Sequence, residues 1–447
     1  MRRIASFGLT VVLALALAAP GYSQEKLVLT LDDCLRLALS GNPFVLATRE
    51  KEAAAEAQVR DAASRFVPSV SGVGSDILDK KVFTLEFPSF VPGEPPQRVK
   101  FDFTKTYQFT LNFSMPIFTG GRLISGFKQA NYNLKATRET IRQSQQETAF
   151  NVKKAFYGYL LARDFSAVAG EAVALAEKHA ANVRNLYDAG LASKFDLLRS
   201  EVQVANLKPQ LIRARNSLEL AGLALKNIIG LDLDRSVEVR GELSLVPLDM
   251  NVEEAVVRAL RQRPELSQLD FQRRMAAEMV KIARGSRLPS LALGGAYNYW
   301  SNNLNFRNKN WESYYTISLN LNVPIFSGFS SYAQVGQSKA LLRELELTGK
   351  GLSETIKLEV RQAVLNYGQA KESLASQEKN VEEAAEAVRI AELNFAEGLA
   401  TGLDVSTAQV ALSQAKTNRS QALHDCVVSL AQLERALGEN VDTEDAK

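Results

Sequence analysis

The residue types that most often carry catalysis or bind metals are sparse in this chain of 447 residues. Its two histidines, His179 and His424, fall on expected helices, where a surface or seam position explains them. No Cys/His ligand spacing, nucleophile elbow, phosphate-binding loop or dinucleotide fingerprint occurs in the sequence. We therefore predict no enzyme, no metal site and no cofactor. Cys34 and Cys426 are expected to be packed side chains on helices, not a disulfide.

Two aspartates occupy equivalent places in the two halves of the chain. Asp196 and Asp404 are 208 residues apart, and each lies within the first turns of an expected helix. A carboxylate in this position interacts favourably with the helix dipole. A structural role at a helix N-terminus is therefore open to both residues.

The composition is ordinary, and the first residues predict export. Apolar residues make up 46%, charged residues 23%, and the formal net charge of +3 gives no argument for nucleic acid. A basic start is followed by an almost wholly apolar run over 4–19 and by small residues near Ser23, which is typical of a cleavable signal peptide at 1–23. No run of 18 apolar residues follows, so entry into a membrane would require a barrel.

Two stretches, 107–115 and 315–323, alternate between apolar and small polar side chains with the period of a strand. At ~3.3 Å per residue each reaches ~30 Å, enough for a tilted strand to cross the ~25 Å apolar band of an outer membrane. The predicted lipid face comprises Tyr107, Phe109, Leu111, Phe113, Tyr315, Ile317, Leu319 and Leu321. The predicted lumen face comprises Gln108, Thr110, Asn112, Ser114, Thr316, Ser318, Asn320 and Asn322.

These strands belong to a unit that the chain contains twice. Beyond the strands, Pro116 and Pro324 begin a series of matches at an offset of 208 residues. Each unit reads as helix, helix, strand, strand, long helix, helix, with the longer strand connection in the first unit at 79–98. We place the signal peptide at 1–23, the first repeat at 24–241, the second at 242–438 and a short tail at 439–447. The expected strands are about 66–77, 107–115, 290–299 and 315–323. The expected long helices are about 121–189 and 330–396, and the helices that return from them are about 193–230 and 402–437.

The long helices predict a coiled-coil architecture. Residues 121–189 contain no proline and would form a helix of ~100 Å, too long to pack inside a globular domain. The first returning helix carries a heptad seam, and Cys426 falls on the matching seam of the second. Arg419 interrupts that second seam. Either it faces a water-filled interior, or the register has drifted from the seven-residue repeat.

Four strands in one chain force an assembly. An open sheet edge is not tolerated in lipid, because its backbone groups would remain unpaired, and membrane barrels begin at about eight strands. Two chains would supply 8 strands and three would supply 12, of which the larger barrel leaves a lumen. Small polar inward residues suit that lumen better. The fold class is therefore an α+β membrane protein whose four strands contribute to a shared β-barrel.

This combination of features resembles the TolC-type outer-membrane efflux channels over essentially the whole mature chain. The resemblance rests on the signal peptide, the Pro-Ile-Phe-x-Gly strand endings, the Gly-Leu-Ala turns, the 208-residue repeat, and the helix starts at Asn42-Pro43 and Arg263-Pro264. It implies a homotrimer with a 12-stranded barrel in outer-membrane lipid and a ~100 Å helical barrel in the periplasm. It also implies two partners, a periplasmic adaptor protein and an inner-membrane transporter of the RND, ABC or MFS class.

The same resemblance assigns residues to the periplasmic end. The expected adaptor-contacting tips are Gly190, Leu191, Gly398 and Leu399. The expected periplasmic aperture contains Asp404, Asp196, Phe395 and Thr407. Three symmetric copies of Asp404 in a narrow pore would concentrate negative potential and favour cations.

Around that aperture the chain departs from the best-known family member. Phe395 and Ala400 stand where a tyrosine and an arginine help to hold the entrance shut, and Thr407 replaces a second acidic ring. The closing contacts must therefore differ, or the gate must rely on packing.

From the strands, the helices and this resemblance we expect a passive trimeric duct of a tripartite efflux or type I secretion system. The alternative is a soluble periplasmic coiled-coil scaffold, in which the strands form a small protein-binding sandwich, since half-buried strands alternate in the same way.

Overall fold

A computed structural model describes residues 27–77, 82–89, 91–102, 107–244, 250–301, 304 and 311–439. The predicted signal peptide at 1–23 and the tail beyond residue 439 lie outside these described residues. So does part of the expected connection at 79–98.

The order of elements confirms the duplicated unit. The first copy contains α1 (Leu31–Gly41), α2 (Pro43–Ser64), β2 (Ser69–Asp76), β5 (Tyr107–Phe118), α3 (Arg122–Asp188) and α4 (Lys194–Ile228). The second contains α5 (Val252–Gln262), α6 (Pro264–Gly285), β7 (Ser290–Ser301), β8 (Glu312–Asn322), α7 (Ser330–Ala396) and α8 (Gly402–Leu437). The fold is therefore α+β, with two helices of 67 residues each, α3 and α7.

The chain divides into two compact units, each built from both copies. The coiled-coil unit contains Asn151–Leu245, Ser376–Val427 and the described residues up to Ala38. The strand unit contains Leu39–Phe150, Val246–Ala375 and the described residues from Val428 onward.

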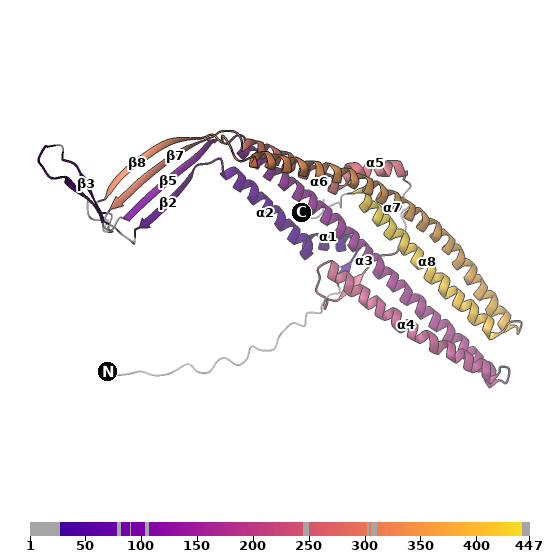
Figure 1. The fold of residues 1–447 in the computed structure, drawn as a ribbon. Coiled ribbons are helices and arrows are strands. Elements are labelled where there is room, and N and C mark those ends of the chain that lie inside the picture. Colours follow the sequence, from indigo (N-terminus) through magenta and orange to yellow (C-terminus); the bar gives the residue numbers. More distant parts are fainter. Residues whose placement is uncertain are drawn as a thin grey trace, which may run out of the picture. The chain divides into compact units, whose positions relative to one another are not determined.

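The strand unit is organised by a four-stranded antiparallel sheet in the order β2-β5-β7-β8 (Figure 1). β5 and β7 form its centre. Because β5 belongs to the first repeat and β7 to the second, the two repeats meet between strands that are far apart in the sequence. β5 continues past the expected end at Met115 to Phe118, and its register with β7 shifts between Pro116 and Phe118. A bulge accommodates the proline, which cannot donate to the ladder.

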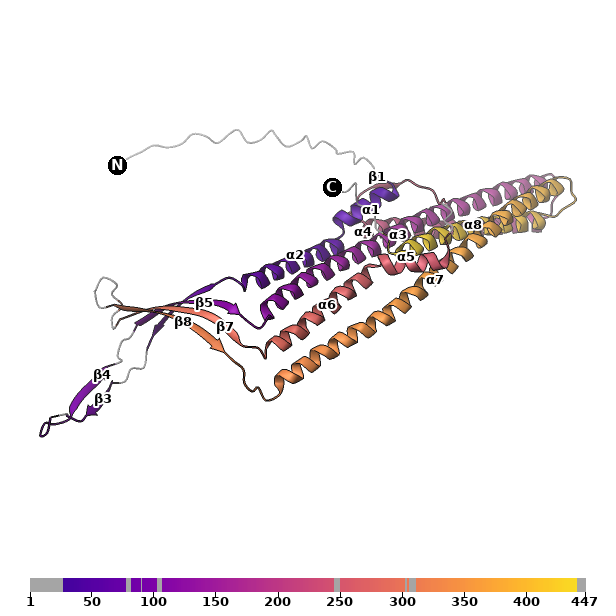
Figure 2. The ribbon, with the colours of Figure 1, turned by 90° about the horizontal axis from the view of Figure 1, so that it is seen from above.

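Two small sheets were not predicted. In the strand unit, β3 (Val82–Phe87) and β4 (Gln97–Asp102) pair as an antiparallel ribbon within the stretch expected to be a loop. Figure 2 shows this ribbon apart from the four-stranded sheet. In the coiled-coil unit, β1 (Leu27–Leu29) pairs in parallel with β6 (Val237–Val239).

In the coiled-coil unit, α3 with α4 and α7 with α8 form two helical hairpins whose turns lie at the same end (Figures 1 and 2). At the start of the unit, a hydrophobic core joins α1, α3, α4 and the small parallel sheet. Its buried residues are Leu29, Cys34, Ala38, Val152, Phe156, Leu160, Leu225, Ile229 and Val239.

Both cysteines are buried and neither forms a disulfide, so the prediction of packed side chains is confirmed. Burial raises the pKa of the Cys34 thiol to about 12, with a smaller contribution from neighbouring Asp33. Cys426 is fully buried, as a seam position requires. Arg419, which interrupts that seam, is half-exposed and lies 3.9 Å from the carboxylate of Glu378 on α7.

The helix starts in the strand unit follow from local chemistry. Asn42 caps α2 by accepting a hydrogen bond from the Phe44 amide at 2.8 Å, and proline occupies the first position of α2 and of α6. Arg263 precedes α6 without capping it through its side chain. Instead, its guanidinium is 8% exposed and binds Glu265 at 2.9 Å and Glu359 at 2.7 Å. This pairing joins the start of α6 to α7.

Candidate functional site

The four-stranded sheet separates apolar from polar side chains as the alternation predicts. The register places Phe113 beside Val70 and Gly295 on one face, and Asn112 beside Ser71 and Ala296 on the other. The same phase holds along β8, where Ile317 lies opposite Gly295. All eight predicted lipid-facing residues therefore lie on one face and all eight predicted lumen-facing residues on the other. What each face contacts remains a prediction.

Much of the apolar face is exposed, although Trp311 stacks on Tyr299 with the ring centroids 4.7 Å apart. Along β8, Tyr315 is 75% exposed and Ile317 76% exposed. A shallow apolar groove of about 430 Å³ runs over this face between Val70, Leu111 and Ile317. Exposed apolar surface on this scale marks a binding or membrane surface, because water solvates it poorly.

The opposite face carries small polar groups that bond to one another. The Thr110 hydroxyl donates to the Asn298 side-chain oxygen at 2.9 Å, and the Asn320 amide donates to the Ser318 hydroxyl at 3.1 Å. None of the predicted lumen residues is charged. A neutral, hydrogen-bonding surface of this kind suits contact with water.

The sheet has two open edges. Among the described strands, β2 pairs only with β5 and β8 only with β7. The outer backbone groups of β2 and β8 are therefore available to another chain.

The turns of the two helical hairpins have the same construction. Gly190 and Gly398 adopt φ of +75° and +76°, which a glycine tolerates without a side-chain clash. The next residues, Leu191 and Leu399, each donate a backbone hydrogen bond of 2.8 Å to the preceding helix. Their side chains are 77% and 76% exposed. Each hairpin thus ends in a rigid turn that presents one leucine to the surroundings.

Each of the two predicted carboxylates bonds back to the residue three positions before it, at the start of a returning helix. Asp196 accepts a 2.6 Å hydrogen bond from the Ser193 hydroxyl, and Asp404 accepts bonds of 2.7 Å and 2.8 Å from the Thr401 hydroxyl and amide. The Thr401 hydroxyl is the main cause that lowers the pKa of Asp404, followed by the Thr401 amide. Both carboxylates are exposed. The helix-terminus role is therefore observed, and a role of Asp404 in a pore stays a prediction.

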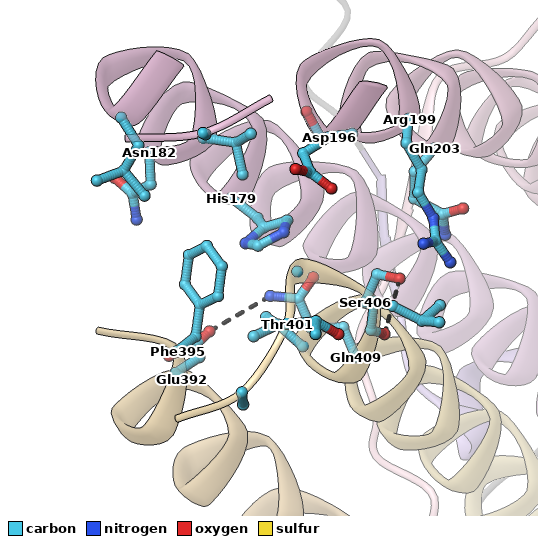
Figure 3. A pocket seen from close by; sticks show the side chains of 18 of the residues that line it. His179, Asn182, Asp196, Arg199, Gln203, Glu392, Phe395, Thr401, Ser406 and Gln409 are labelled. Atoms are coloured by element: carbon cyan, nitrogen blue, oxygen red, sulfur yellow. Dashed lines mark hydrogen bonds between the residues drawn. The ribbon is translucent and has the colours of Figure 1, made fainter. Parts of the chain in front are cut away.

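A cleft of about 1120 Å³ separates the two hairpins near these turns. Asp196, Phe395 and Thr407 of the predicted aperture line it, together with Ala400. Figure 3 shows His179 of α3 directed across the cleft toward Phe395 of α7, and the two ring centroids lie 5.2 Å apart. The sequence placed His179 on a helix surface or seam, and nothing in its local pattern indicated this contact.

An ion pair also joins the two hairpins, and a hydrogen bond links the helices of the second one. Lys416 of α8 binds both carboxylate oxygens of Glu171 on α3, at 2.6 Å and 2.7 Å. Within the second hairpin, Gln409 donates to Glu392 at 3.3 Å (Figure 3). These polar contacts are exposed, and pairs of this kind each contribute about 0.2–1 kcal/mol.

The described residues contain no group of three or more His, Cys, Asp or Glu side chains that could hold a metal ion. No helix in the described ranges is long and apolar enough to cross a membrane.

Comparison with known proteins identifies what the chain resembles. The profile of the outer membrane efflux protein family matches residues 34–231 and 255–439. The outer membrane protein TolC of Vibrio cholerae is 25% identical over 339 residues, which cover 73% of this chain and 76% of that protein. The alkaline protease secretion protein AprF of Pseudomonas aeruginosa is 25% identical over 338 residues, covering 73% and 69% of the two chains.

Solved structures share the fold at low sequence identity. The outer-membrane channel CmeC of Campylobacter jejuni gives a TM-score of 0.76 at 18% identity, with 93% of this chain and 88% of that chain covered. The outer membrane protein VceC of Vibrio cholerae gives 0.74 at 19% identity, with 91% and 96% covered.

Proposed function

Because the chain belongs to the outer membrane efflux protein family, we propose that three copies of it close one 12-stranded barrel around a shared aqueous lumen. Family membership confirms the prediction of an outer-membrane channel component that is not an enzyme. The soluble periplasmic scaffold, the alternative from the sequence, is therefore not favoured.

The observation that carries the trimer proposal is the sheet itself. Its apolar face is exposed, its polar face is uncharged, and its two edge strands lack an outer partner among the described strands. In lipid, each unpaired backbone group would cost several kcal/mol, about 2–7 on most scales. Pairing β8 of one copy with β2 of the next removes both edges and turns every apolar face outward.

The two helical hairpins form the periplasmic entrance in this proposal. Asp404, held near the turn by Thr401, would stand in three symmetric copies around the narrowest opening. Its lowered pKa keeps the carboxylate charged at neutral pH, so the ring would favour cations. The exposed Leu191 and Leu399 would be the side chains that an adaptor contacts.

The partners proposed for the duct are a periplasmic adaptor and an inner-membrane transporter of the RND, ABC or MFS class. Among the relatives, TolC is named as an outer membrane protein and AprF as a protease secretion protein. Small-molecule efflux and type I protein secretion are thus both open to this chain. In either system the transporter supplies the energy, and this chain supplies the passage.

The test is the state of the protein extracted from outer membranes with detergent. We expect light scattering to give three chains per particle and planar bilayers to show cation-selective conductance. A monomer that needs no detergent, or a trimer that conducts no ions, would overturn the proposal. Co-purification with an adaptor tests the tips. We expect Leu399→Asp to abolish it and Leu347→Asp to leave it intact. The two variants are matched because both leucines are well exposed and only Leu399 lies in a turn.

A further inference from the structure

His179 lies where the two helical hairpins of the coiled-coil unit meet. Its side chain is on α3, and it is 8% exposed, although it borders the cleft. On α7 it contacts the ring of Phe395, and on α8 it packs against the backbone of Gly402. A Cβ atom added at Gly402 would lie 3.3 Å from Nε2 of the imidazole. One imidazole therefore bridges both helices of the second hairpin.

This contact differs in kind from the other links between the hairpins. Lys416 of α8 and Glu171 of α3 join the hairpins as a pair of opposite charges. Burial favours the neutral form of an imidazole, because the charged form would lose hydration. His179 is thus a contact between the hairpins that protons can change at mildly acidic pH.

The surrounding charges do not replace the lost hydration. Glu392 on α7 is the acidic group whose charge acts on the imidazole. Lys178 on α3 and Arg199 on α4 line the same cleft with the opposite sign, and Asp196 faces it from the start of α4. On α8, Asp404 is engaged with Thr401. Burial lowers the pKa of His179, and Glu392 and a hydrogen bond with the Gly402 backbone offset only part of that effect.

We propose that His179 is a proton-sensitive latch, whose neutral imidazole holds the α3/α4 hairpin to the α7/α8 hairpin and whose protonation releases it. The inference rests on the proposed function, because it makes these hairpins the wall of the entrance. Phe395 presents an apolar ring and no polar group to His179, so this contact would hold the entrance shut by packing and not by a side-chain hydrogen bond between the two.

The sign follows from linkage. In the structure, where His179 is buried between the hairpins, its pKa is below the ordinary value of 6.5; we take this packed arrangement as the closed state, and on release the ring regains water. The closed state is therefore fully stabilised above pH 6.5 and loses stability as pH falls through 6.5 toward the lower closed-state pKa. When His179 is fully protonated, the ratio of open to closed channels rises about tenfold for each unit by which its pKa in the open state exceeds its pKa in the closed state. Acid opens the entrance.

The experiment records single channels of the detergent-purified trimer in planar bilayers from pH 8 to pH 5. We expect the open probability to rise several-fold as pH falls, and the rise to be absent in His179→Gln, which stays neutral and retains an amide donor. His424→Gln is the matched control, because His424 also lies on a helix but faces Asp425 at 3.1 Å and not the cleft. It should keep the wild-type pH response.

A second measurement follows the hairpins directly. Spin labels at Leu191→Cys and Leu399→Cys sit on the two exposed turns, while the native Cys34 and Cys426 are buried and react poorly. We expect the distance distribution between the labels to broaden to longer values at pH 5, and to stay unchanged in the His179→Gln background.

The outcomes separate the two proposals. If no trimer forms or no channel conducts, the proposed function fails. If channels conduct but their open probability and label distances do not depend on pH, or if His179→Gln responds like the wild type, the latch fails and the channel stands. A response lost in His424→Gln and kept in His179→Gln would likewise overturn it.

Discussion

Ile317 and Thr316 are adjacent on β8, and they offer a matched test of which face of the sheet meets lipid. Their side chains lie on opposite faces, and both are exposed in the isolated chain. Ile317 is 76% exposed and stands at the centre of the 11-residue strand. The perturbation is one arginine, introduced either as Ile317→Arg or as Thr316→Arg.

The expected magnitude follows from the depth of the residue. At ~3.4 Å per residue, β8 is about 37 Å long, and a tilt of ~40° leaves about 28 Å across the membrane. The centre of the strand then lies near the bilayer midplane, where arginine on the lipid face costs about 2–4 kcal/mol. Three copies would raise the cost to about 6–12 kcal/mol per trimer. Thr316→Arg places its guanidinium in the lumen, where water solvates it, so its cost should stay below about 1 kcal/mol.

The assay is folding into lipid vesicles from denaturant, followed by denaturant titration of the inserted trimer. We expect Ile317→Arg to insert poorly and to unfold at markedly lower denaturant concentration, and Thr316→Arg to resemble the wild type. Thr316→Arg should also reduce cation selectivity, because it adds a positive charge to the lumen. Equal losses in both variants, or a larger loss in Thr316→Arg, would refute the assignment of faces.

Three further predictions concern other parts of the chain. Arg263→Ala should lower the free energy of unfolding by about 2–3 kcal/mol, because it leaves the carboxylates of Glu265 and half-exposed Glu359 unpaired. Arg263→Lys keeps the positive charge and should lose less stability. If thermal melts show the same loss for both variants, the role of the paired charges is contradicted. Phe156→Ala should cost about 3–5 kcal/mol in denaturant titration, since its ring is 2% exposed in the core; a loss below about 1 kcal/mol would show that the core is loosely packed. Asp404→Asn should shift the reversal potential toward lower cation selectivity. The selectivity of the wild type should stay constant from pH 8 to pH 5, because the lowered pKa of Asp404 keeps its carboxylate charged until below pH 3.8. An unchanged reversal potential in Asp404→Asn would place Asp404 away from the aperture.

Features with a local cause could be predicted from the sequence. The limits of α7 and α8 match the expected 330–396 and 402–437, since prolines and glycines end each helix within a few residues. The phase of the strands was also correct, because side chains of a strand must alternate. The first strand was expected to start at residue 66, and it starts at Ser69 because the Phe66 and Val67 amides still bond to the end of α2.

The missed elements have non-local causes. β1 and β6 are three residues each and pair across most of the first repeat, so neither has enough sequence to show a period. β3 and β4 lie in a stretch rich in proline and glycine around Pro92 and Gly93, which is typical of a loop.

Local patterns in the sequence predicted the long helices, the four long strands, the duplication and the chemical character of each strand face. They could do so because backbone geometry and helix caps act over a few residues. The packing of the whole chain was needed to show that β5 and β7 form the centre of the sheet and that Arg263 binds Glu359 of α7. It also decided that His179 is buried against Phe395. These contacts join residues separated by tens to hundreds of positions, and which of many possible partners meet depends on how the whole chain packs.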